Sequence, residues 1–104
     1  MSNRIEALQA MLAQDSGNSF ARYGLAMEYG KAGRFEDAMH EFRTVIAANP
    51  NYVAAYFHGG HMLEQMGQIE EARSIYEQGI EAAMRTGDNH ARSELQAALD
   101  ILPL

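Results

Sequence analysis

The sequence predicts an all-α protein of about six helices, and three observations support this fold class. Alanine is the commonest residue, at 17 of 104 positions, and Glu, Gln, Leu, Met and Arg supply much of the rest. These residues are strong helix formers, whereas the β-branched residues that favour strands are sparse. Turn-forming residues also recur at regular intervals, and one residue pattern appears twice at a fixed spacing.

Five short breaks divide the chain into segments with helical periodicity. The segments predict helices near residues 3–14, 19–31, 35–48, 52–65, 69–85 and 89–102. Pro50 cannot continue the third of these helices, and Asn51 is expected to cap the fourth. Gly87 followed by Asp88 predicts a helix stop and a new N-cap.

Residues 19–52 and 53–86 align without a gap, at a period of 34 residues. The turn between the two helices of each unit carries the clearest match. Gly33–Ala38 reads Gly-Arg-Phe-Glu-Asp-Ala, and Gly67–Ala72 reads Gly-Gln-Ile-Glu-Glu-Ala. A fixed period of this length with two helices per unit is typical of a helical solenoid.

The two units resemble the tetratricopeptide repeat family. The first unit carries the family pattern as Leu25, Ala26, Tyr29, Gly33, Ala38, Phe42 and Pro50, and the second as Tyr56, Gly60, Leu63, Gly67, Ala72, Tyr76 and Gly79. The resemblance implies one domain, 1–104, folded as a right-handed α-solenoid of antiparallel helix pairs. Its parts would be a half-unit helix at 3–18, repeat one at 19–52, repeat two at 53–86 and a C-terminal capping helix at 88–102.

Three further expectations concern the ends of this array. Met84 stands where the family usually has Pro, so the fifth helix is expected to continue towards Gly87. In the first helix, we expect the buried side to carry Leu8, Met11 and Leu12. In the last helix, we expect the inward side to carry Leu95, Leu99 and Leu102.

The first helix of each unit carries a second apolar stripe, on the side away from its partner helix. In the first unit this stripe is Phe20, Tyr23 and Met27, at i, i+3 and i+7. In tetratricopeptide solenoids this stripe lines the concave groove that receives peptides. By resemblance, the groove is lined here by Phe20, Tyr23, Met27, Lys31, Phe57, His58, His61 and Glu64. The alternative is that Phe20, Tyr23 and Phe57 are partly buried and enlarge a small core.

Composition and charge exclude several other classes of protein. Eight basic residues against 14 acidic residues give a net charge of −6, which argues against a nucleic-acid partner. The absence of cysteine excludes disulfides and thiolate chemistry. The longest apolar run, Tyr52–Phe57, is too short for a membrane helix, so we expect no membrane partner and a cytoplasmic location. No cofactor motif is present.

The sequence offers two further candidate sites, one for a metal ion and one for a peptide carboxylate. His58 and His61 share one helix face and could both reach a Zn²⁺ or Ni²⁺ ion, with Glu64 one turn further on, but no third well-placed ligand is evident, so no metal site is predicted. Family members that hold a chaperone's C-terminal carboxylate use Lys and Asn in the groove. The matching positions here are Tyr23, Met27, His58, Asp88 and Arg92, of which only Arg92 fits.

The sequence therefore predicts a non-enzymatic interaction module that binds a peptide or helical segment of a partner protein with apolar side chains. A second hypothesis is a self-associating module that forms a homo-oligomer, since short repeat arrays leave apolar ends exposed. A third is a metal-binding protein that uses His58 and His61.

Overall fold

The computed structural model describes residues 3–103, which form six helices and no strand. The helices are α1 (Asn3–Gln14), α2 (Ser19–Lys31), α3 (Phe35–Ala48), α4 (Val53–Gln65), α5 (Ile69–Thr86) and α6 (Asn89–Asp100). The all-α fold class is confirmed, and every expected helix is present with ends that differ by at most two residues.

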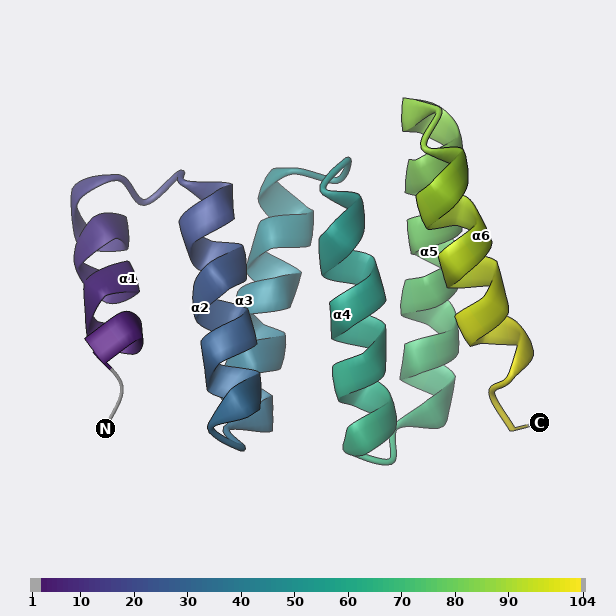
Figure 1. The fold of residues 1–104 in the computed structure, drawn as a ribbon, viewed down its shortest axis with the longest axis horizontal. Coiled ribbons are helices and arrows are strands. Elements are labelled where there is room, and N and C mark those ends of the chain that lie inside the picture. Colours follow the sequence, from purple (N-terminus) through teal and green to yellow (C-terminus); the bar gives the residue numbers. More distant parts are fainter. Residues whose placement is uncertain (1–2, 104) are drawn as a thin grey trace.

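Neighbouring helices run antiparallel and stack along the long axis of a molecule that measures 38 × 29 × 19 Å (Figure 1). The most extensive packing is between α2 and α3 and between α4 and α5, the two helix pairs that the repeat predicts. Helices α2, α4 and α6 lie nearer the viewer than α3 and α5, and α4 contacts both α2 and α6. The first helices of successive pairs therefore form one layer.

The core lies between the two layers. Its largest fully buried side chains are Tyr76, Phe42, Met39, Leu63, Leu95 and Val45. Each such side chain contributes about 1.5–3 kcal/mol by leaving water. Small residues let the helices approach: a Cβ at Gly79 would lie 2.6 Å from the Cβ of Tyr56. The repeat thus places large residues on one helix opposite small residues on its partner.

Three glycines end helices with a left-handed backbone. Gly33, Gly67 and Gly87 have φ values of 78°, 77° and 72°, a conformation that costs other residues energy. Gly87 caps α5, which continues to Thr86 as the replacement of Pro by Met84 predicts. The Asp88 side chain then accepts a hydrogen bond from the Ala91 N–H and caps α6, so the predicted stop and start are both confirmed.

Two local expectations are wrong. Asn51 does not cap α4: the N-cap residue is Tyr52, and no side chain makes a capping hydrogen bond there. Oδ1 of Asn51 instead accepts a hydrogen bond of 3.2 Å from Arg85 Nε. Met11 is 46% exposed, whereas Leu12 is buried. The reason is that α1 packs on α2 alone, so only one narrow face of α1 is covered.

The C-terminal expectation is confirmed: Leu95 and Leu102 are buried and Leu99 is partly buried. None of the helices between residues 3 and 103 combines the length and the apolar character needed to cross a bilayer.

Candidate functional site

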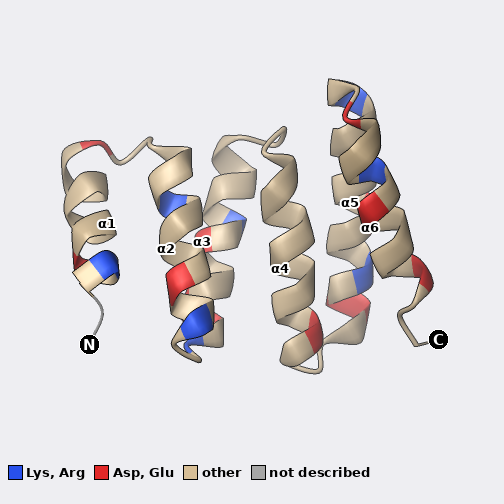
Figure 2. Cartoon of the chain, viewed as in Figure 1, with Lys and Arg blue, Asp and Glu red and all other residues tan. Residues whose placement is uncertain are grey.

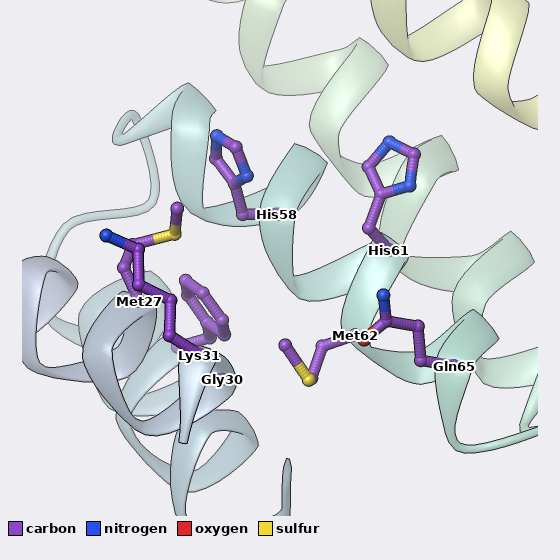
Figure 3. Close-up of a pocket in the computed structure, with 8 residues that line it drawn as sticks. Met27, Gly30, Lys31, His58, His61, Met62 and Gln65 are labelled. Atoms are coloured by element: carbon purple, nitrogen blue, oxygen red, sulfur yellow. The ribbon is translucent and has the colours of Figure 1, made fainter. Parts of the chain in front are cut away.

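A hollow of about 300 Å³ opens between α2 and α4. This α2/α4 hollow is lined by Met27, Gly30, Lys31, Phe42, His58, His61, Met62 and Gln65. Figure 3 shows Met27 and Lys31 reaching across from α2, with His58 and His61 on the opposite helix and Met62 extending towards Gly30. A Cβ at Gly30 would lie 2.6 Å from the Met62 methyl, so this glycine leaves the space that the thioether fills.

Two more hollows lie between α4 and α6. The α4/α6 hollow, of about 430 Å³, is lined by Val53, Ala54, Phe57, His58, Asp88, His90, Ala91, Glu94 and Leu95. The Ile101 hollow, of about 330 Å³, is lined by Phe57, His61, Glu94, Ala97, Ala98 and Ile101. The α4/α6 hollow shares His58 with the α2/α4 hollow, and the Ile101 hollow shares His61 with it. The three hollows are therefore neighbours along α2, α4 and α6, and together they are called the groove.

A chain of aromatic rings forms the wall of this groove. Ring centroids lie 5.8 Å apart for Tyr23 and His58, 5.3 Å for Phe57 and His58, and 4.6 Å for Phe57 and His61. Tyr23 also packs edge-on against the buried Phe42 at 6.1 Å. Tyr23 and Phe57 are both partly buried and packed against the core. Phe57 also lines the two hollows between α4 and α6, whereas Tyr23 borders the groove through its edge-on contact with His58.

Burial shapes the electrostatics of the groove. It lowers the pKa of His58 below the ordinary value of 6.5, nearby His61 lowers it further, and Glu94 acts in the opposite direction. Burial also raises the pKa of Tyr23. Both shifts favour the neutral form of the side chain.

Glu64, which the sequence assigns to the groove, lines none of the three hollows. Its carboxylate accepts a hydrogen bond from the buried Tyr76 hydroxyl, whose pKa is raised by burial and then by this bond. Nδ1 of His61 lies 3.8 Å from the same carboxylate. Between residues 3 and 103, no three His, Asp or Glu side chains come together as metal ligands.

The structure brings most of the predicted residues together. The hollows are lined by Met27, Lys31, Phe57, His58 and His61. Tyr23 packs edge-on against His58. Phe20 stands apart with 73% of its surface exposed. Lys31 Nζ lies 3.5 Å from Glu28, which also pairs with Arg4 at 3.1 Å.

Sequence reasoning did not find the residues of α6 and its C-terminal end that line the Ile101 hollow, which are Glu94, Ala97, Ala98 and Ile101. Met27 on α2 corresponds to His61 on α4, 34 residues later, and to Ala97 on α6, a further 36 residues on. The same spacings relate Lys31, Gln65 and Ile101. The signal was the replacement of Pro by Met84: α5 runs to Thr86, and α6 starts 36 residues after α4. Arg92, which a strict period of 34 assigns to the groove, instead lies in a separate surface depression with Ser93 and Gln96.

The chain matches known proteins over most of its length. A family model described as tetratricopeptide repeat matches residues 29–99. The TPR repeat-containing protein PA0015 of Pseudomonas aeruginosa is 33% identical over 95 residues, which cover 91% of this chain and 90% of that protein.

Solved structures give the same result. The NMR structure of a tetratricopeptide repeat domain protein from Salinibacter ruber is 35% identical, with a TM-score of 0.76 over 79% of this chain and 83% of that one. The type III secretion chaperone SycD of Yersinia enterocolitica, in complex with a peptide of the translocator YopD, has a TM-score of 0.74 at 21% identity, over 89% and 75% of the two chains. The family match spans more than half of this chain, which therefore belongs to the tetratricopeptide repeat family.

Proposed function

We propose that this protein is a non-enzymatic interaction module that binds a segment of a partner protein in the groove across α2, α4 and α6. The observation that carries the proposal is that three neighbouring hollows with shared lining residues follow one another along the layer of first helices. Rigid rings and adaptable methionines line the groove, and such side chains provide contact area at a small entropic cost. We place its action in the cytoplasm, the compartment that the sequence predicts.

The comparison with SycD supports a peptide ligand. That chaperone has a similar fold and was solved with a peptide of its translocator. The hollows, of about 300, 430 and 330 Å³, lie at the lower end of the roughly 300–1,000 Å³ of ligand pockets, and they lie side by side along the layer of first helices. An extended or helical segment that places successive apolar side chains in successive hollows suits this shape.

The proposal is tested by filling the groove without disturbing the core. Ala54 and Ala97 are exposed, lie on helices and line the hollows between α4 and α6. Substitutions Ala54→Gln and Ala97→Gln add bulk with almost no cost in helix propensity. Ala47→Gln, on the exposed side of α3, is the matched control.

The assay begins with a displayed library of random peptides selected on the wild-type protein, and fluorescence anisotropy then gives the Kd of each selected peptide. We expect the two groove substitutions to weaken binding about tenfold or more, which is about 1.4 kcal/mol, and the control to leave it unchanged. Equal binding by all three variants would place the binding site elsewhere, and failure to select any peptide would contradict the proposal.

Self-association is a second candidate, favoured by the exposure of large apolar side chains at several places. Phe20 is 73% exposed and Ile101 is 78% exposed. Sedimentation velocity across a wide concentration range tests this candidate: a sedimentation coefficient that rises with concentration, and that Phe20→Ser or Ile101→Ser reduces, supports it. A constant monomer value rejects it.

A further inference from the structure

We propose that the α6 end of the groove selects a partner segment in which Lys or Arg lies next to a large apolar side chain. This inference rests on the proposed function and adds the chemistry of the ligand. Two features placed side by side carry it: an apolar hollow, and a carboxylate that has no Lys or Arg partner in the described part of the chain.

The apolar feature is the Ile101 hollow. Its walls are the Phe57 ring and the side chains of Ala97, Ala98 and Ile101. Ile101 is 78% exposed, although Ala98, about one turn before it, and Leu95, nearly two turns before it, are buried. A large aliphatic or aromatic side chain of a ligand would cover Ile101 and remove this apolar surface from water.

The charged feature is the carboxylate of Glu94. It borders both the Ile101 hollow and the α4/α6 hollow, and half of its side chain is exposed. Within residues 3–103 it makes one ion-pair contact, at 3.5 Å to Nε2 of His90, and none to Lys or Arg. Asp88 lies in the same α4/α6 hollow, where its Oδ1 accepts the Ala91 N–H and its charge adds to that of Glu94.

The rest of the groove does not neutralise this end. Helix α4 carries one charged residue, Glu64 (Figure 2). The Glu64 carboxylate accepts a hydrogen bond from the Tyr76 hydroxyl. The groove lysine, Lys31, lies at the far α2 end and pairs with Glu28. Arg92 of α6 lies in a separate depression, so the charged side chains that line the two hollows at this end are Asp88 and Glu94, both acidic. The whole protein is acidic too, with a net charge of −6. A cation would be attracted to Glu94, and an acidic segment would be repelled.

The test uses substitutions that remove charge and keep shape. Glu94→Gln removes the proposed partner charge, and Asp88→Asn removes the supporting charge while it keeps a good N-cap residue. Glu77→Gln is the control, because Glu77 is exposed on α5 outside the three hollows and the change in net charge is the same. The probes are the peptides selected on the wild-type protein, and the strongest of them resynthesised with its basic residue replaced by norleucine.

We expect the selected peptides to be enriched in Lys or Arg beside an apolar residue. Glu94→Gln should weaken their binding about fivefold, or about 1 kcal/mol, and Asp88→Asn by less. The norleucine peptide should bind the wild-type and Glu94→Gln proteins equally, and added salt should weaken the binding of the basic peptide to the wild-type protein.

Two outcomes overturn the inference. The first is that the selected peptides are not enriched in Lys or Arg, or that Glu94→Gln weakens their binding no more than Glu77→Gln does. In either case the α6 end does not select a ligand by its charge. Loss of binding in Ala97→Gln would then show that the groove still binds peptides and that the proposed function stands. If no peptide is selected at all, the proposed function and this inference fail together.

Discussion

Two adjacent glycines inside α4 provide the sharpest test of the packing between the layers. Gly59 and Gly60 are both buried in the helix interior, where glycine costs about 1 kcal/mol relative to alanine. A Cβ at Gly59 would lie 3.6 Å from Phe42 Cβ, which is an ordinary contact. A Cβ at Gly60 would lie 2.7 Å from Tyr76 Cζ and still closer to two other carbons of that ring.

The Tyr76 ring cannot move away from an added methyl group. It is fully buried, and its hydroxyl donates a hydrogen bond to Glu64. Overpacking of this kind costs about 1–3 kcal/mol, and the overlap with three ring atoms at Gly60 favours the upper value. After the gain in helix propensity, Gly60→Ala should destabilise the protein by about 2 kcal/mol, whereas Gly59→Ala should stabilise it by about 0.5–1 kcal/mol.

Urea unfolding followed by circular dichroism measures both free energies of unfolding. The expected difference between the two variants is about 3 kcal/mol. In thermal unfolding, each kcal/mol shifts the Tm of a domain of this size by about 4–8 °C, so the two variants should separate clearly. Equal stability of Gly59→Ala and Gly60→Ala would refute the proposed close packing of α4 on α5, and a change in the m-value would show that a two-state comparison is invalid.

Three other predictions follow from single sites. Because burial lowers the pKa of His58 in the folded state, the unfolded state binds more protons just below the ordinary value of 6.5. Stability should therefore fall as the pH drops through that region, and His58→Asn should flatten this fall in urea midpoints measured between about pH 7.5 and pH 5. Gly87→Ala should cost about 1 kcal/mol because the φ of Gly87 is 72°, whereas Gly17→Ala, at a glycine without positive φ, should be near neutral in the same urea assay. Tyr56→Phe should cost about 0.5–1.5 kcal/mol, because it removes the 2.6 Å hydrogen bond that the Tyr56 hydroxyl donates to the Pro50 carbonyl, which keeps a 3.2 Å bond from Arg85 Nη2; an unchanged Tm would contradict this.

The helices could be predicted from sequence because local signals determine them. Helices end at Gly33, Gly67 and Gly87, where the backbone takes a left-handed conformation that favours glycine. The segments between the breaks have a helical period. The exposure of Met11 could not be predicted in this way. Its periodicity is that of a buried residue, but α1 has one neighbour where an internal helix has more. Burial at the end of an array depends on which helices are present, and a residue pattern does not contain that information.

The groove was predictable on α2 and α4 and missed on α6, and the difference has one physical cause. A repeat of 34 residues fixes the position of a groove residue only while each helix and connection keeps its length. Helix α5 has 18 residues where α3 has 14, and α6 begins 36 residues after α4. Ala97, Glu94 and Ile101 therefore line the Ile101 hollow in place of the residues that a strict period selects. One helix end thus decides which side chains a partner would meet.

The same repeat explains why the fold alone does not determine the ligand. Packing constrains the residues between the layers, where Gly60 and Tyr76 leave no freedom. The groove positions carry no such constraint, and equivalent sites hold Met27, His61 and Ala97. If the groove binds a partner as proposed, the differences among equivalent positions would carry the specificity. Since Lys31 lies at the α2 end and Glu94 at the α6 end, a bound segment would then have a preferred direction, with its basic residue towards α6.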